Sequence, residues 1–321
     1  MFTRVYQIWR PRKPFSEAHL VFLSLLLAPS ISLAQTDTIP VVTTLPVLMD
    51  FVQQIGGPRV TVKSLINGLE SEHTYTPKPS DVLSVSQARM LVKVGLGLEI
   101  WVNDLIRNAE NRNLLTVNTS EGVPLIKDTE DHDASDKDRA GESFKERHSM
   151  GNPHIWLDPE NAKTMIRHIT DGLIKVDPAH KGEYLSNQSM YLKALSGLED
   201  EIKRRVRGLP DRRIITHHGA WPYFARRFGF IIEDTIVLQV GAEPSARHIQ
   251  ELIEKIRRKK IKVIASEPQL NPQVPNLLAQ ETGARVVLLS PLPGALPGTE
   301  TYLELIRYDS EQLLSALEGR P

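Results

Sequence analysis

Residues 179–207 read AHKGEYLSNQSMYLKALSGLEDEIKRRVR, contain no proline, and end at Gly208-Leu209-Pro210. Apolar side chains recur through this stretch at helical spacing: Tyr184, Leu185, Met190, Leu192, Leu195, Leu198 and Ile202. The pattern predicts a helix of roughly 25 residues, about 37 Å long at 1.5 Å per residue, which is more than one small lobe requires. We interpret it as a rigid helix that links two lobes, although an ordinary long surface helix would show the same pattern.

On both sides of this stretch, short apolar runs alternate with amphipathic runs. The strand-like runs are 41–45, 60–62, 90–94 and 114–117 before it, and 213–216, 231–238, 261–265 and 285–289 after it. The helical patterns fall near 46–55, 81–88 and 98–109, and near 221–228, 245–255, 273–282 and 300–317. Such alternation predicts an α/β fold in which each lobe has a mainly parallel sheet flanked by helices.

We divide the chain into a signal peptide (1–34), a first α/β lobe (35–178), a linking helix (179–207) and a second α/β lobe (208–321). The first 34 residues carry basic residues, then the apolar run 20–28, then small residues before Ala34, as in a cleavable secretory signal. An N-terminal membrane anchor is the alternative, but the run is shorter than the roughly 20 apolar residues that span a bilayer. The sequence has no cysteine for lipid attachment, so we expect a periplasmic protein that is not a lipoprotein.

Composition excludes several classes of function. The 39 basic and 39 acidic residues balance, which gives the chain no electrostatic reason to bind nucleic acid. The absence of cysteine excludes disulfide frameworks, thiolate metal sites and cysteine nucleophiles. A charged fraction of 24% and a mean hydropathy of -0.25 are typical of a soluble globular protein.

Residues 128–148 form an unusual segment of the predicted first lobe. They contain no Ile, Leu or Val but eight acidic residues, so they cannot bury enough apolar surface to offset chain entropy. We predict a mobile loop. Its two histidines, His132 and His148, fit either a solvated linker or weak capture of metal ions.

Three histidines stand in loops that are favourable for a binding site. His73 lies in a loop stiffened by two prolines and followed by an N-cap at Ser80 or Asp81. His154 lies shortly before Asp158-Pro159, a good N-cap and first helical position, while His217 and His218 follow the strand 213–216. Ligands of open α/β sheets bind beyond the carboxyl ends of strands, and neutral imidazole suits a tetrahedral zinc site. Dispersed histidines are often unrelated, so spacing alone leaves a shared site open.

Six motifs together carry a family resemblance. They are HTYTPKPSD at 73–81, VGLGLEIW at 94–101, NPHIWLDP at 152–159, HGAWPYF at 218–224, EPQ at 267–269 and ETGA at 281–284. In this order the motifs resemble those of the zinc/manganese solute-binding proteins of bacterial ABC importers, over nearly the whole mature chain. The patterns around His73 and His154 are the most specific of them.

The resemblance implies two α/β lobes joined by a long rigid helix, with one metal ion held in the cleft by His73, His154 and His218. It also implies a periplasmic carrier, not an enzyme, that delivers Zn(II) to a permease in the inner membrane; we expect a monomer. His217 would support its neighbour, and the acidic loop resembles that of zinc-binding members. Three neutral imidazoles favour zinc, and a manganese-binding member is the alternative.

This sequence departs from the family pattern at two positions. Ser290 stands where many members have an aspartate as fourth ligand, so Glu267 or water would complete the metal shell. Gly219 replaces an aspartate that would orient the third histidine. A secreted zinc hydrolase with Glu267 as base and an adhesin-like surface protein are competing hypotheses. The hydrolase lacks support from motifs, because the chain has no His-Glu-x-x-His or Gly-x-Ser-x-Gly pattern.

Overall fold

The computed structural model of this protein describes residues 38–126, 151–238 and 241–319. The predicted signal peptide and the acidic segment 128–148 lie outside these residues. Within the described ranges, no helix combines the length and the apolar character needed to cross a membrane.

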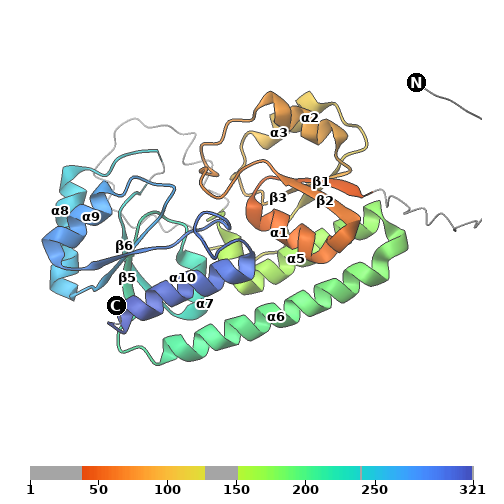
Figure 1. Cartoon of the computed structure of the whole chain (residues 1–321). Helices are drawn as coiled ribbons and strands as arrows, with labels where there is room; N and C mark the ends of the chain where they lie inside the picture. The colour runs from red at the N-terminus through yellow and green to blue at the C-terminus, as the bar shows by residue number, and fades with distance from the viewer. Residues whose placement is uncertain (1–37, 127–150, 239–240, 320–321) are drawn as a thin grey trace, which may run out of the picture. The chain divides into compact units, whose positions relative to one another are not determined.

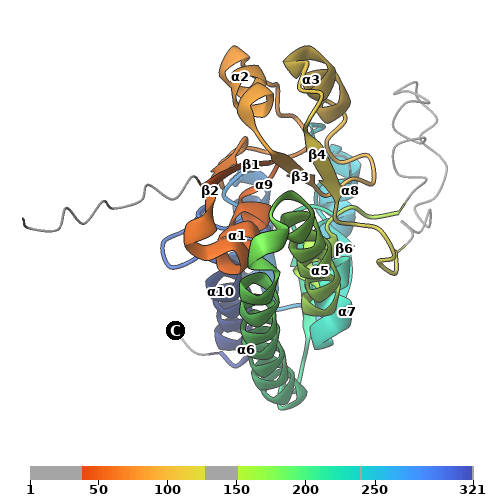
Figure 2. The same cartoon turned by 90° about the vertical axis from the view of Figure 1, so that its right-hand side faces the viewer.

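The first lobe is built on a parallel four-stranded sheet in the order β2-β1-β3-β4. Its strands are β1 (Ile39–Thr43), β2 (Val60–Ser64), β3 (Met90–Lys93) and β4 (Leu115–Asn118). Its helices are α1 (Pro46–Gly56), α2 (Pro79–Gln87), α3 (Val102–Ala109) and α5 (Pro159–Val176). Figure 2 shows α2 and α3 on one side of this sheet and α1 and α5 on the other. Because the strands are parallel, their carboxyl ends all lie at the same edge of the sheet.

The second lobe repeats this arrangement with the order β6-β5-β7-β8, again fully parallel. Its strands are β5 (Arg213–Thr216), β6 (Ile231–Thr235), β7 (Val263–Ser266) and β8 (Arg285–Leu288). Its helices are α7 (Pro222–Phe228), α8 (Ala246–Lys259), α9 (Gln273–Thr282) and α10 (Tyr302–Leu317). Buried Ile215 and Ile264 pack toward Leu252 of α8 and Leu278 of α9 in one apolar cluster. In Figure 1, α7 and α10 lie on the side of this sheet away from α8 and α9.

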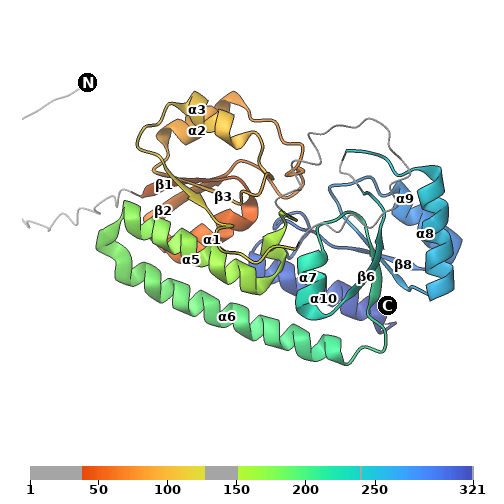
Figure 3. The same cartoon turned by 180° about the vertical axis from the view of Figure 1, so that it is seen from behind.

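A single helix of 27 residues, α6 (Lys181–Arg207), runs along both lobes (Figures 1 and 3). It packs against α1 and α5 of the first lobe and against α7 and α10 of the second. Its buried face includes Leu195, Leu198, Ile202 and Val206. The predicted α/β fold with two lobes and a long linking helix is confirmed, while the residue limits of the lobes stay a prediction.

Buried polar contacts join the lobes near this helix. The carboxylate of Asp50 in α1 accepts hydrogen bonds from the Tyr191 hydroxyl of α6, at 3.0 Å, and from the Tyr302 backbone N–H of α10, at 2.9 Å. The Trp156 indole N–H donates to the carbonyl of Pro291 at 2.7 Å. Since such groups are costly to leave unpaired in the interior, these bonds hold the two lobes in one arrangement.

Candidate metal centre

The three predicted histidines come from three separate loops. His73 lies between β2 and α2, and His218 stands two residues after β5. His154 directly precedes the short 3-10 helix η2 (Ile155–Leu157), which leads into α5. There Asp158 accepts a hydrogen bond from the Glu160 N–H at 2.9 Å and Pro159 opens the helix, which confirms the predicted N-cap. The rigid start of α5 fixes the segment that carries His154.

The structure brings these histidines together with Glu72. Nε2 of His154 lies 3.1 Å from Nε2 of His73, 3.4 Å from Nε2 of His218 and 3.4 Å from Oε1 of Glu72. One ligand atom from each of the four residues lies within 4.8 Å of all the others. Tetrahedral zinc with bonds of 2.0–2.1 Å has neighbouring ligand atoms about 3.4 Å apart. The three separations from His154 are close to this value and His73 Nε2 lies 3.9 Å from Glu72 Oε1, so the four side chains lie close enough to share a single ion.

Two of the imidazoles are oriented by hydrogen bonds at Nδ1. Nδ1 of His154 lies 3.0 Å from the side-chain oxygen of Asn152, and Nδ1 of His218 lies 2.8 Å from Glu267. Because both partners offer an oxygen acceptor, Nδ1 carries the proton and Nε2 keeps a lone pair for a metal. Asn152 also donates to the carbonyl of Gly219 at 2.7 Å, so it connects the His154 and His218 loops.

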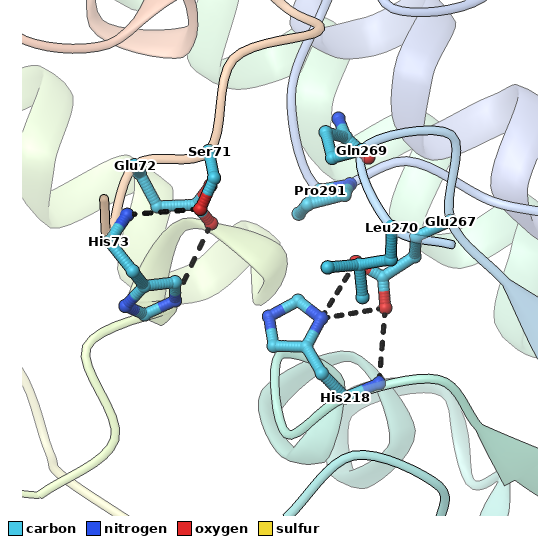
Figure 4. Close-up of a pocket in the computed structure, with 8 residues that line it drawn as sticks. All are labelled: Ser71, Glu72, His73, His218, Glu267, Gln269, Leu270 and Pro291. Carbon is cyan, nitrogen blue, oxygen red and sulfur yellow. Dashed lines mark hydrogen bonds and ion pairs between the residues drawn. The ribbon is translucent and has the colours of Figure 1, made fainter. Parts of the chain in front are cut away.

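Figure 4 shows Glu267 on the side of His218 that is away from His73. This carboxylate is only 1% exposed and also accepts a hydrogen bond from the Trp221 indole N–H at 3.0 Å. His217 contacts the backbone of the same residue, since its Nδ1 accepts the Glu267 backbone N–H at 3.3 Å. The sequence predicts Glu267, or water, at the fourth ligand position; in the structure both carboxylate oxygens of Glu267 lie 2.8 Å from Nδ1 of His218. Glu267 acts there on the orientation of His218.

Glu72 was not singled out by sequence analysis. Its Oε1 is buried and, among the described residues, has no hydrogen-bond partner. An acidic residue directly before His73 was the available signal, but one acidic residue in a loop has no diagnostic pattern. A buried anionic oxygen without a donor, surrounded by imidazole nitrogens, fits a site that receives a cation.

Ser290, at the position where the family resemblance led us to expect an aspartate, lies in the loop that follows β8. Its backbone N–H donates to Asp309 at 3.0 Å and its hydroxyl donates to the carbonyl of Leu292 at 2.9 Å. The hydroxyl also accepts from the side chain of Gln269 at 3.0 Å. Its hydrogen bonds are thus with its own loop, with Gln269 and with Asp309.

Charge interactions set the protonation of the cluster. Burial raises the pKa of Glu72, but the contact with His154 and the positive charge of the three imidazoles in their protonated form outweigh burial and bring this pKa to about 2. Burial lowers the pKa of His154. Burial also acts to lower the pKa of His218, but the charge and hydrogen bond of Glu267 outweigh it and raise that pKa. The site therefore combines an anionic Glu72 with one imidazole whose pKa is lowered, His154, and one whose pKa is raised, His218.

Comparison with known families then decides the class of protein. Residues 41–316 match the family model described as zinc-uptake complex component A, periplasmic (ZnuA). The chain belongs to this ZnuA family. Its relatives include a protein of Treponema pallidum (strain Nichols) whose name assigns metal binding provisionally; it is 31% identical over 255 residues, which are 79% of each chain.

Other ZnuA relatives differ in the metal that their names give. The high-affinity zinc uptake system protein ZnuA of Bacillus subtilis (strain 168) is 27% identical over 88% of each chain. The iron-binding protein YfeA of Yersinia pestis is 27% identical over 93% of this chain and 96% of its own. The family thus establishes extracytoplasmic metal binding for ABC uptake, with a membrane permease as partner, and leaves the metal undecided.

Solved structures share the fold of this ZnuA family member. A crystal structure of ZnuA superposes with a TM-score of 0.75 at 27% identity, covering 88% of this chain and 100% of that one. A manganese-bound mutant of a periplasmic metal-binding protein from candidatus liberibacter asiaticus gives 0.73 at 25% identity, covering 86% and 98%. The family and the relatives named above are solute-binding proteins of ABC importers, not enzymes, so the protein is a metal solute-binding component and the hydrolase hypothesis is set aside. Another neighbour, titled a laminin-binding adhesin of Streptococcus agalactiae, has a TM-score of 0.74 at 26% identity, so the adhesin-like hypothesis stays open.

Proposed function

We propose that this protein captures Zn(II) outside the cytoplasm and delivers it to the permease of an ABC importer. The observation that carries the proposal is the convergence of three imidazole nitrogens and one carboxylate oxygen within 4.8 Å of one another, with the separations from His154 near those of tetrahedral zinc ligands. We assign His73, His154, His218 and Glu72 as the ligands. Glu267 takes the role of the carboxylate that orients His218, in place of the ligand role considered from sequence.

The choice of zinc over manganese or iron follows from donor chemistry. Imidazole nitrogen suits zinc, whereas manganese prefers carboxylate, carbonyl and water oxygens. A site with nitrogen and oxygen donors also binds zinc more tightly than Fe(II) or Mn(II) in the general order of divalent metals. A ligand set of three imidazole nitrogens and one carboxylate oxygen therefore favours Zn(II), and manganese is the alternative substrate.

Capture needs little rearrangement of the ligands. The Nδ1 contacts of His154 and His218 already present Nε2 to the centre, and the buried polar contacts at Asp50 and Trp156 hold the lobes together. Preorganisation of this kind reduces the conformational entropy that is lost on binding. Delivery to the permease needs a second arrangement with weaker binding, so we assign the change to a loop that carries ligands and not to wide separation of the lobes.

The proposed location rests on the sequence of the N-terminal region. With the signal peptide cleaved after Ala34 and no cysteine for lipid attachment, we propose a free periplasmic carrier that works as a monomer. The mass of the exported protein tests cleavage and lipid attachment together. A mass larger than that of residues 35–321 by one or more acyl chains would contradict the free form.

Competition titration tests the choice of metal. Purified metal-free protein is titrated calorimetrically with zinc, and with manganese in the presence and absence of zinc. We expect one zinc ion per chain and a zinc Kd lower than the manganese Kd by more than about tenfold, which is about 1.4 kcal/mol. His154→Ala should abolish tight zinc binding, whereas His180→Ala, far from the site on a half-exposed turn, should not. Tight manganese binding beside feeble zinc binding would overturn the proposal.

A further inference from the structure

A small cavity beside the metal centre lies between two edges from opposite lobes (Figure 4). Ser71, Glu72 and His73 form the edge from the first lobe. Gln269, Leu270 and Pro291 line it from the second lobe. An ion that enters or leaves through this cavity must pass between these edges.

Gln269 connects the two edges. Its side-chain amide donates one hydrogen bond to the carbonyl of Gly68, at 2.7 Å, and one to the Ser290 hydroxyl, at 3.0 Å. Ser290 is itself anchored by its bonds to Asp309 and Leu292. The amide of Gln269 is therefore fixed on the second lobe and holds a backbone carbonyl of the first.

The backbone of Gly68 makes a second, independent contact between the two lobes. A Cβ atom built on Gly68 would lie 2.5 Å from Pro293 O, 2.5 Å from Ala295 N and 2.7 Å from Gly294 C. These are backbone atoms, which cannot move aside as the end of a flexible side chain can. The backbone at Gly68 thus touches the loop that follows β8, and only a residue without a side chain fits there.

The loop that contains Gly68 is bonded within itself. The side-chain oxygen of Asn67 accepts the N–H groups of Leu69, at 2.9 Å, and Glu70, at 3.2 Å. The Ser71 hydroxyl accepts the N–H of His73 at 3.3 Å. Because of these internal bonds, residues 67–74 form a unit that carries Glu72 and His73 with it; we call it the 67–74 loop.

We propose that Gln269 is a positioning residue that holds the 67–74 loop, and with it Glu72 and His73, on the bound metal. Rupture of the hydrogen bond to Gly68 is then the step that releases two of the four ligands and sets the rate of metal exchange. This inference rests on the proposed function and adds to it the residue that controls release. The lobes stay joined at Asp50 and Trp156 during this step.

Two variants test the inference through the rate of zinc loss. Gln269→Met keeps the length of the side chain and removes both hydrogen bonds, and Gly68→Ala places a methyl group against backbone atoms of the opposite lobe. Zinc-loaded protein is mixed with excess chelator in a stopped-flow instrument, and the dissociation rate is recorded. We expect both variants to lose zinc at least about tenfold faster, equivalent to about 1.4 kcal/mol.

Matched controls separate positioning from general destabilisation. Gln280→Met changes an exposed glutamine on α9, and Gly197→Ala changes a glycine of α6 with open space around it. Both controls should release zinc at the rate of the unmodified protein. The Co(II) absorption spectrum of Gln269→Met should keep its tetrahedral form, because all four ligands are retained, and its unfolding midpoint without metal should stay near that of Gln280→Met.

The outcomes distinguish this inference from the proposed function. Dissociation rates within twofold of the unmodified protein for both Gln269→Met and Gly68→Ala would overturn the role of Gln269 and leave zinc capture standing. An equal acceleration in the Gln280→Met control would overturn it as well. Failure of the unmodified protein to bind zinc would instead overturn the proposed function.

Discussion

Nδ1 of His218 lies 2.8 Å from the carboxylate of Glu267, a residue that is 49 positions away in the chain and almost fully buried. The contact fixes the imidazole so that Nε2 faces His154, and its charge strengthens His218 as a ligand. The two carboxylates thus occupy different places: Glu72 lies among the imidazole nitrogens that face the centre, and Glu267 contacts Nδ1 of His218.

The first prediction concerns Glu267. Glu267→Gln keeps an oxygen acceptor for Nδ1 but removes the negative charge, so zinc affinity should fall by about 10- to 100-fold. Calorimetric or chelator competition titration measures the change. Glu281→Gln, at an exposed position in the last turn of α9, is the matched control. Unchanged affinity in Glu267→Gln would show that the carboxylate does not act on His218.

The second prediction concerns Glu72. Glu72→Gln removes the only anionic ligand that we assign, and we expect a larger loss of zinc affinity than in Glu267→Gln. The neighbouring Glu70→Gln, whose carboxylate pairs with Lys78 at 3.2 Å, should bind zinc normally. Unaltered zinc affinity in Glu72→Gln would mean that Glu72 is not a ligand and that water takes the fourth position.

The third prediction concerns pH. Metal binding requires neutral imidazoles, and Glu267 raises the pKa of His218, whereas burial lowers that of His154. As pH falls, His218 is therefore the first of these two to bind a proton in competition with the metal. Apparent zinc affinity should be constant at high pH and then decline by about tenfold per pH unit for each competing proton. An affinity that does not change between about pH 8 and pH 5 would contradict this competition.

The fourth prediction concerns Asp309, a buried residue of α10. Burial raises the pKa of Asp309 well above its ordinary value, and its Oδ2 has no hydrogen-bond partner within the described part of the chain. The folded state therefore keeps this proton to a higher pH than the unfolded state. The contribution to stability is full below the unfolded pKa and declines as pH rises toward the folded pKa, by at most about 1.4 kcal/mol per pH unit.

Urea unfolding of metal-free protein at several pH values checks this sign. Asp309→Asn cannot titrate, so its stability relative to the unmodified protein should increase as pH rises from about 4 toward neutrality. Asp50 and Glu99, whose pKa values burial also raises, remain in both proteins and cancel in the comparison. A stability difference that is independent of pH would mean that Asp309 is ionised in the folded protein.

Much of the fold could be predicted because its signals are local. Apolar runs bounded by turns located the strands, and the uninterrupted stripe of 179–207 located α6 to within two residues. The start of α2 was predicted two residues late, at Asp81. The Asp81 side chain accepts the Lys78 N–H at 2.8 Å and the Tyr75 hydroxyl at 2.6 Å, so it acts inside the first turn and the helix begins at Pro79.

The site could be predicted only in part because ligand geometry depends on contacts between distant segments. The loops of His73, His154 and His218 were recognisable from their motifs and from the strand ends or helix starts beside them. Which carboxylate faces the metal and which faces Nδ1 of His218 depends on how β5 and β7 place residues 218 and 267 side by side. No pattern along the chain distinguishes the roles of Glu72 and Glu267.

X-ray absorption at the zinc edge, on protein loaded with one equivalent of zinc, tests the shared ion most directly. We expect four nitrogen or oxygen neighbours near 2.0–2.1 Å, with multiple-scattering features from three imidazole rings. A first shell of five or six oxygen-rich neighbours, or one with fewer than three imidazoles in the unmodified protein, would contradict the account.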